Sequence, residues 1–206
     1  MSPQPQGTSP GPDRRTPHRT GPGPTSPDPA PGTTPAAAVR RRPSLPFDPI
    51  EAAAGLWSQH WDDVPRMRAV TSLMRVHQLV LTELDERLRP LGLTFARYEV
   101  LVLLSFSRRG ALPLGKIGER LQVHATSVTP LVKRLEAAEL IRRTPHPEDG
   151  RAVLASITPA GRELLERATE VVMGARFGLG SLSDEQCDDL TELLTPPREA
   201  AGDFEV

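Results

Sequence analysis

The sequence predicts a mainly α-helical chain that also contains one short β-hairpin. Apolar residues recur at intervals of three and four along much of residues 47–197, which is the spacing of amphipathic helices. Two β-prone stretches, 140–144 and 151–158, flank the turn sequence Pro-His-Pro-Glu-Asp-Gly. Residues 1–46 differ, since they hold 13 of the 23 prolines and few large apolar side chains. Such a segment buries too little surface to offset the entropy of ordering it, so we expect a disordered tail.

Composition excludes several classes of protein. The single cysteine, Cys187, rules out an intrachain disulfide and the usual four-ligand structural zinc site. The longest apolar run, Val100–Leu104, is far shorter than the roughly 20 residues of a membrane helix. The N-terminus has Pro and Arg where a secretory signal would be apolar, so we expect a cytoplasmic protein with no membrane partner. Without a phosphate-binding glycine loop or a metal-spaced His/Asp/Glu group, we expect neither an enzyme nor a cofactor.

Charge is unevenly distributed along the chain, although the net charge is only -1. Residues 1–46 carry six Arg and two Asp, whereas residues 184–206 carry eight acidic residues and one Arg, and end in an acidic tail, 198–206. Residues 108–151 hold nine Lys or Arg against five Asp or Glu. This middle segment is therefore the basic part of an otherwise acidic folded region.

The N-terminal part of the folded region predicts three helices. Asp48 can cap the first helix, Pro49 suits its first position, and it ends before Pro65 with Trp61 still at a helical interval. A long helix follows and ends at Pro90 and Gly92; Thr94 then caps a third helix, 95–106, whose nearly continuous apolar character predicts burial. The long helix carries a heptad seam formed by Met67, Val70, Met74, His77, Leu81, Leu84 and Leu88.

Two short helices and the hairpin follow in immediate succession. Leu114, Ile117 and Leu121 mark the first short helix, residues 122–125 form a turn, and a second helix follows. The second helix has an apolar stripe formed by Val128, Leu131, Val132 and Leu135. A helix-turn-helix followed at once by a hairpin is a winged helix, predicted here for residues 111–158. In this arrangement the second helix fits the major groove of double-stranded DNA and the hairpin tip reaches the neighbouring minor groove.

The side chains that this arrangement would present to DNA are mostly hydrogen-bond donors. At the hairpin tip Gly150 permits the reversal and Asp149 can orient Arg151 into the minor groove, although an ordinary turn with a local ion pair would use the same residues. Pro130 falls in the first turns of the second helix, where a missing N–H costs little. The predicted DNA-binding residues are Thr126, Ser127, Thr129, Pro130, Lys133, Arg134, Arg143, Asp149 and Arg151.

Two further helices complete the chain. Thr158 with Pro159 begins one, and Ser183 with Gln186 has the spacing of a capping box that opens the last, through Cys187, Leu190 and Leu194.

The segment 114–164 resembles the MarR family of winged-helix regulators without a gap. It includes that family's Asp-x-Arg wing signature, Asp149 and Arg151, and the Thr-Pro-Ala-Gly that follows the wing. The resemblance covers roughly residues 66–195 and implies one MarR-type domain over 47–197. It implies an obligate homodimer that binds a pseudo-palindromic operator and usually represses transcription, with 47–106 and 159–195 as dimerisation helices. Glu139 stands where the family usually ends the recognition helix with Gly, so the usual left-handed cap is not predicted.

The resemblance also implies a small aromatic or apolar ligand in a crevice between the dimerisation and DNA-binding lobes. His77 has the plainer alternative of a core or interface histidine, and the tryptophans that of helix-packing anchors. The candidate wall residues are Trp57, Trp61, Met74, His77, Gln78, Arg97 and Tyr98.

Two other functions fit the sequence less well. A winged helix used as a protein-interaction module would favour an apolar recognition surface, and this chain has Thr, Ser, Lys and Arg there. A thiol-based redox regulator would use Cys187, because the "TPLVKRLEAA" stretch is similar to the organic-hydroperoxide-sensing branch of the family. That branch uses an N-terminal cysteine, which this chain lacks, and the carboxylates around Cys187 disfavour a reactive thiolate. We therefore expect Cys187 to be a packing residue.

Overall fold

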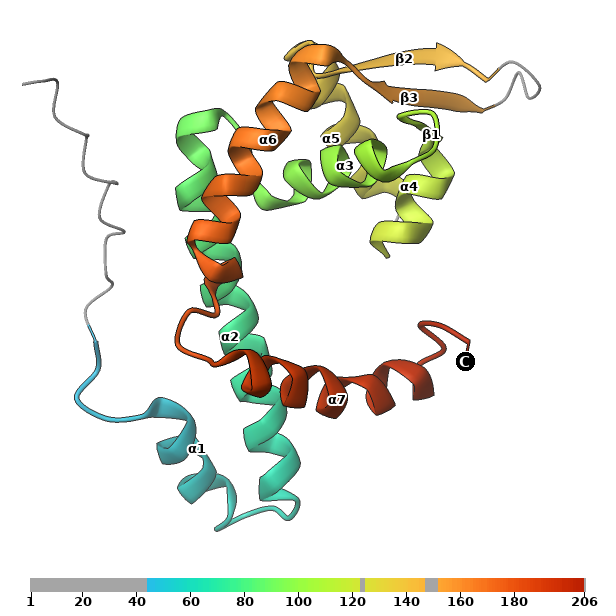
Figure 1. Ribbon diagram of the computed structural model, residues 1–206. Helices are drawn as coiled ribbons and strands as arrows, with labels where there is room; N and C mark the ends of the chain where they lie inside the picture. Colours follow the sequence, from blue (N-terminus) through green and yellow to red (C-terminus); the bar gives the residue numbers. More distant parts are fainter. Residues whose placement is uncertain (1–43, 123–124, 147–151, 206) are drawn as a thin grey trace, which may run out of the picture. The chain divides into compact units, whose positions relative to one another are not determined.

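The computed structural model describes residues 44–122, 125–146 and 152–205 (Figure 1). The chain divides into two units, Met1–Ala38 and Val39–Val206, and every described element belongs to the second unit. The predicted tail, 1–46, therefore lies almost entirely outside the described residues.

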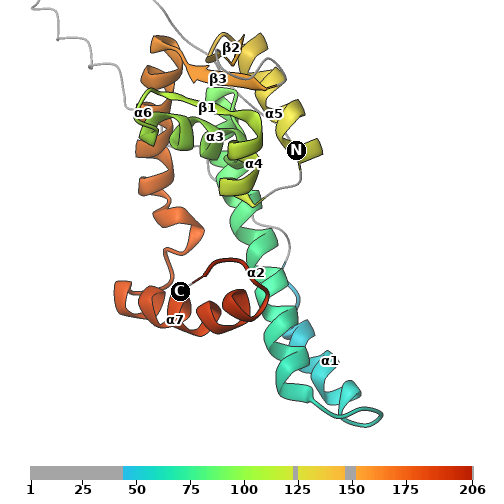
Figure 2. The same cartoon turned by 90° about the vertical axis from the view of Figure 1, so that its right-hand side faces the viewer.

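The described unit is mainly helical with one small sheet, as the sequence predicts (Figures 1 and 2). The sheet is antiparallel in the order β1-β3-β2, and β1 was not predicted because its three residues, Ala-Leu-Pro, show no alternation. Its strands are β1 (Ala111–Pro113), β2 (Ile141–Pro145) and β3 (Val153–Ile157). The helices are α1 (Pro49–Trp57), α2 (Val64–Leu88), the 3-10 turn η1 (Arg89–Leu91), α3 (Phe95–Phe106), α4 (Leu114–Leu121), α5 (Ala125–Ala137), α6 (Pro159–Gly174), the 3-10 turn η2 (Arg176–Gly178) and α7 (Asp184–Ala200).

Helix α1 begins where the sequence predicts and ends earlier. The Asp48 carboxylate accepts hydrogen bonds from the backbone N–H of Ile50 at 2.8 Å and of Glu51 at 3.4 Å, so this cap is confirmed. The helix ends at Trp57, which makes the prediction of Trp61 as a helical position wrong. Trp61 instead lies in the connection to α2, where its ring centroid is 4.9 Å from that of Trp57.

The junction between α2 and α3 is held by a side chain that the sequence did not predict. Gly92, with a φ of 69°, turns the chain after η1. Thr94 occupies the N-cap position of α3, but its side chain makes no capping hydrogen bond. The Phe95 N–H instead donates to the Asp85 carboxylate of α2 at 2.7 Å. The prediction of Thr94 as the N-cap residue is confirmed in position, but its hydroxyl accepts from the Arg97 Nε at 3.2 Å and not from a backbone N–H of the first turn.

Helix α3 lies at the centre of the fold and contacts α2, α4, α5, α6, β1 and β3. Val100, Leu101 and Leu104 are fully buried, as predicted from the apolar character of this helix. The predicted stripe of α5 packs into the same core through Val128, Val132 and Leu135, with Leu131 partly buried. Helix α4 adds Ile117 to this core, so the two helices of the helix-turn-helix are held by their apolar faces.

The turn from α5 into β2 uses a glutamate in the left-handed conformation. Glu139 has a φ of 59°, although L residues with side chains pay about 1 kcal/mol or more there. The Leu140 N–H donates to the Leu135 carbonyl at 3.0 Å and the Glu139 N–H to the Glu136 carbonyl at 2.9 Å. These two bonds make a Schellman cap, so the family's usual cap forms here without glycine.

Thr158 joins the end of β3 to the end of α5. Its N–H donates to the Leu140 carbonyl at 3.1 Å, and its hydroxyl lies 2.8 Å from the Glu139 carbonyl oxygen and 3.0 Å from that of Leu140. The hydroxyl also accepts from the Gly161 N–H at 3.0 Å, which confirms Thr158 as the cap of α6. A β-carbon at Gly161 would overlap the Leu140 carbonyl oxygen and lie 2.9 Å from the Ile157 side chain. Glycine is therefore required for α6 to approach this closely.

Helix α7 begins with the predicted capping box between Ser183 and Gln186. It continues through Pro196 and Pro197 to Ala200, past the predicted end of the dimerisation helices at 195 and into the predicted acidic tail. No residue of α7 is buried within the chain. The Asp203 carboxylate after the helix pairs with Arg198 at 2.8 Å.

Replacing Gly161 with Ala is expected to destabilise the protein by about 2 kcal/mol, because the added methyl group has to displace backbone. The free energy of unfolding in urea measures this effect. Gly174→Ala is the matched control on the same helix, since a β-carbon there meets nothing within 4 Å. A Gly161→Ala protein as stable as the Gly174→Ala protein would contradict this account of the junction.

Candidate nucleic-acid interface

Helix α5 presents a polar face to solvent and an apolar face to the core. Its predicted DNA-binding side chains are all exposed, whereas Val128, Val132 and Leu135 on the opposite side are buried. Within the described residues neither Lys133 nor Arg134 forms an ion pair, so both charges are available to a partner. The exposed set comprises Thr126, Ser127, Thr129, Pro130, Lys133 and Arg134.

Pro130 lies deeper in α5 than the sequence predicts. The helix begins at Ala125, so Pro130 is its sixth residue and falls inside the helix. The backbone N–H groups that lack a partner belong to the first turn. A helix uses this position in its hydrogen-bond ladder, so proline removes one backbone donor from α5.

The wing strands β2 and β3 extend from the C-terminal end of α5 (Figure 1). Arg143 on β2 is half-buried, and its Nε donates to Oε2 of Glu136 on α5 at 2.6 Å. Its guanidinium is thus turned toward the recognition helix and its charge is balanced there. Asp149, Gly150 and Arg151, the predicted wing tip, lie outside the described residues, so their role stays a prediction.

The predicted ligand residues form three groups in the single chain. The ring of Trp57, the last residue of α1, meets that of Trp61 at a tilt of 49°, and the Trp57 indole N–H donates to the Asp62 carbonyl at 2.9 Å. Met74, His77 and Gln78 are exposed on α2. Arg97 and Tyr98 lie on α3, where Tyr98 is buried and its hydroxyl is 3.3 Å from that of Thr169 on α6.

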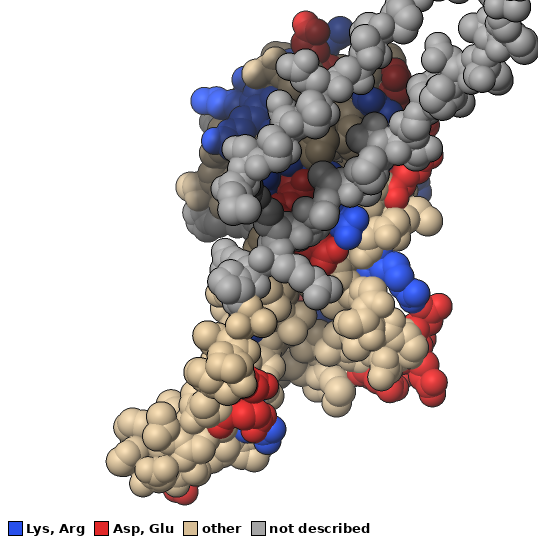
Figure 3. Space-filling view, turned by 90° about the vertical axis from the view of Figure 1, so that its left-hand side faces the viewer, with Lys and Arg blue, Asp and Glu red and all other residues tan. Residues whose placement is uncertain are grey.

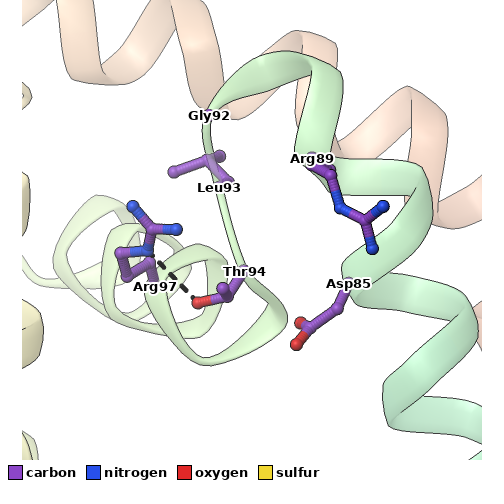
Figure 4. Close-up of a pocket in the computed structure, with 6 residues that line it drawn as sticks. All are labelled: Asp85, Arg89, Gly92, Leu93, Thr94 and Arg97. Atoms are coloured by element: carbon purple, nitrogen blue, oxygen red, sulfur yellow. Dashed lines mark hydrogen bonds between the residues drawn. The ribbon is translucent and has the colours of Figure 1, made fainter.

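A hollow of about 230 Å³ lies at the junction of α2 and α3 (Figure 4). Of the predicted ligand residues only Arg97 lines it, with its Nε donating to the Thr94 hydroxyl at 3.2 Å. Sequence reasoning missed Asp85 and Arg89, because only the turn at Gly92 brings the end of α2 beside the start of α3. Burial raises the pKa of the Glu99 carboxyl, which follows Arg97 by two residues on α3 and also gave no sequence signal. The hollow is lined by Asp85, Arg89, Gly92, Leu93, Thr94 and Arg97.

Cys187 is partly buried on α7, and the Thr191 hydroxyl donates to its backbone carbonyl at 2.9 Å. Over the ranges that the structure describes, no three His, Cys, Asp or Glu residues come together as metal ligands would. In the same ranges no helix has the length and apolar character needed to cross a membrane.

Comparison with known proteins decides the family. The profile of the MarR family matches residues 93–153, from two residues before α3 to the first residue of β3. The organic hydroperoxide resistance transcriptional regulator of Bacillus subtilis is 34% identical over 116 residues, which cover 54% of this chain and 77% of that protein. The chain belongs to the MarR family.

Two solved MarR-family structures from Streptomyces coelicolor extend the similarity beyond the profile. Sco5413 is 51% identical with a TM-score of 0.65, and the match covers 70% of this chain and all of that one. Sco3205, solved in complex with DNA, is 25% identical with a TM-score of 0.61, and the match covers 68% of this chain and 90% of that one. The present MarR-family protein is thus a DNA-binding transcriptional regulator with a winged helix, and not an enzyme.

Proposed function

We propose that this MarR-family protein is a homodimeric repressor that reads a pseudo-palindromic operator through α5. The observation that carries the proposal is the division of α5 into a buried apolar face and an exposed face of hydroxyl, Lys and Arg side chains. Such side chains suit phosphates and the edges of bases. The DNA complex of the similar Sco3205 supports this use of the fold.

The dimer is supported by apolar surface that one chain leaves uncovered. Along α2, Val70, Met74 and Leu81 of the predicted seam are 55%, 54% and 36% exposed, whereas Leu84 and Leu88 are buried in the chain's own core. On α7, Leu193 is 75% exposed. Figure 3 shows that the surface over α1 and the adjoining part of α2 carries few charged side chains. A second copy that pairs α2 and α7 with their counterparts would cover this surface and make a symmetric interface.

A two-fold dimer would present two copies of α5 to DNA. The half-sites would then lie about one helical turn, 34–36 Å, apart along the duplex. Thr129 and Arg134 are suited to base edges, Lys133 to a phosphate, and Arg151, held by Asp149, to a flanking minor groove. Thr126, Ser127 and Pro130 complete the face that enters the major groove.

The proposed reading predicts two different results of truncating α5 side chains. Thr129→Ala and Arg134→Ala should weaken binding by about 5- to 100-fold and change the ranking of operator variants, as loss of a base contact does. Lys133→Ala should weaken all sequences alike and lower the salt slope of binding by about one. Gel shifts at two salt concentrations give both quantities. If all three variants bind DNA as tightly as the unmodified protein, α5 is not the element that reads the operator. That result would favour a protein-interaction module.

The proposed dimer can be tested at exposed positions of the seam. Met74→Glu with Leu81→Glu should produce a folded monomer in light scattering, since both side chains are exposed in the single chain and two charges cannot be buried cheaply. Phe106→Glu, at an 84% exposed position on α3, is the control and should stay dimeric. If the unmodified protein is monomeric at micromolar concentration, both the proposed dimer and the proposed pseudo-palindromic operator are ruled out.

A small aromatic or apolar ligand is proposed to release the operator by favouring a dimer whose two α5 helices are badly spaced. A thermal-shift screen of phenols and aromatic acids should find a binder that lowers operator affinity, and operator should lower the binder's affinity by the same factor. Trp57→Ala and Arg97→Ala should weaken that binder, with Phe106→Ala as control. Binders that all leave operator affinity unchanged would remove the proposed release mechanism.

A further inference from the structure

One ion pair spans the turn between the recognition helix and the wing. Glu136 lies in the last turn of α5, Arg143 is the third residue of β2, and the left-handed Glu139 reverses the chain between them. The Arg143 Nε lies 2.6 Å from Glu136 Oε2, and the two side chains are only 30% and 34% exposed. A charge-assisted hydrogen bond that is partly shielded from water is stronger than an exposed surface pair.

The alternation of β2 separates Arg143 from its neighbour Arg142. Ile141 is buried and Arg143 is half-buried, so these two residues share the face of β2 that packs on the core beside α5. Arg142 is exposed on the opposite face. Although both arginines have the same charge and adjacent positions, only Arg143 can tie the strand to the helix.

The pair also explains why a carboxylate can stand on the helix that is proposed to read DNA. Glu136 follows Lys133 and Arg134 on α5, and an unbalanced negative charge there would repel phosphates. Pairing with Arg143 removes that repulsion. The same pairing makes the Arg143 charge less available to DNA than the exposed Lys133.

In the sheet order β1-β3-β2, β1 pairs only with β3, so β2 is an edge strand whose position relative to α5 also depends on contacts outside the sheet. On the β3 side, the bonds from Thr158 to the Leu140 carbonyl fix the strand. The Glu136–Arg143 pair lies on the β2 side, so the base is held at both strands.

We propose that Glu136 and Arg143 form a strut that sets the wing relative to α5, and that Arg143 is a positioning residue and not a phosphate contact. The strut rests on the proposed function, because its purpose is to place the two DNA probes together. On this proposal Arg143 is set apart from the DNA-binding residues that the sequence predicts.

The test compares full-length variants on a duplex of about 30 base pairs that the unmodified protein selects from a random-sequence pool. The variants are Arg143→Ala, Glu136→Ala, the double Ala variant, and the exchange Glu136→Arg with Arg143→Glu. Arg142→Ala is the control on the outer face of the same strand. Affinity is measured at several salt concentrations, and thermal unfolding confirms that each variant folds.

A strut predicts that either single Ala variant weakens binding by about tenfold and that the double variant is no weaker than the singles, as coupled residues behave. The exchange should restore affinity to within about threefold, and the salt slope should stay unchanged. Arg142→Ala should show no coupling to Glu136→Ala.

A phosphate contact predicts a different pattern, which would overturn the strut. Arg143→Ala would then lower the salt slope by about one, Glu136→Ala would leave affinity unchanged or raise it, and the exchange would bind worst of all. If the exchange variant does not fold, Glu136→Gln distinguishes the two hypotheses. Removing the Glu136 charge weakens DNA binding only if the Glu136–Arg143 pair acts as a strut. An unmodified protein that selects no duplex would overturn the proposed function itself, whereas selection followed by the phosphate pattern overturns the strut alone.

Discussion

The contact of α6 with the end of α5 is the constraint on which the DNA-binding half of this protein depends. Without a side chain at Gly161, the first turn of α6 lies directly against the Leu140 carbonyl, and Thr158 bonds to the same carbonyl. The end of the recognition helix, the start of β2 and the exit of β3 therefore meet at one point. These contacts involve backbone, so they leave less freedom than side-chain packing and fix where the wing begins.

From this point the wing and α5 are organised as two probes with a common base. The buried residues of α5 pack on α3, which leaves its hydroxyl, Lys and Arg side chains facing outward. The Glu136–Arg143 pair lies on the inner face of the hairpin, while Arg142 is outside. Equal charges thus acquire different roles through burial: a paired guanidinium holds geometry, and an exposed one can meet a phosphate.

The other half of the chain leaves apolar residues exposed in a single copy. The seam of α2 is buried only near its C-terminal end, and α7 buries none of its residues. The predicted ligand residues likewise fall into separate groups on α1, α2 and α3. The exposed apolar residues fit the proposed dimer, because a second copy would cover them.

The sequence by itself determined the order of helices, the hairpin and the polar face of α5, because the apolar period and the caps at Asp48, Thr158 and Ser183 are local signals. Only the tertiary structure decided which polar groups meet. Asp85 of α2 accepts from the Phe95 N–H at the start of α3, Glu139 takes the left-handed turn, and Arg143 pairs with Glu136. The strand β1 gave no signal because three residues are too few for a period, and β3 supplies its hydrogen bonds. Each of these outcomes depends on a partner from another element, and sequence spacing does not report the distance to such a partner.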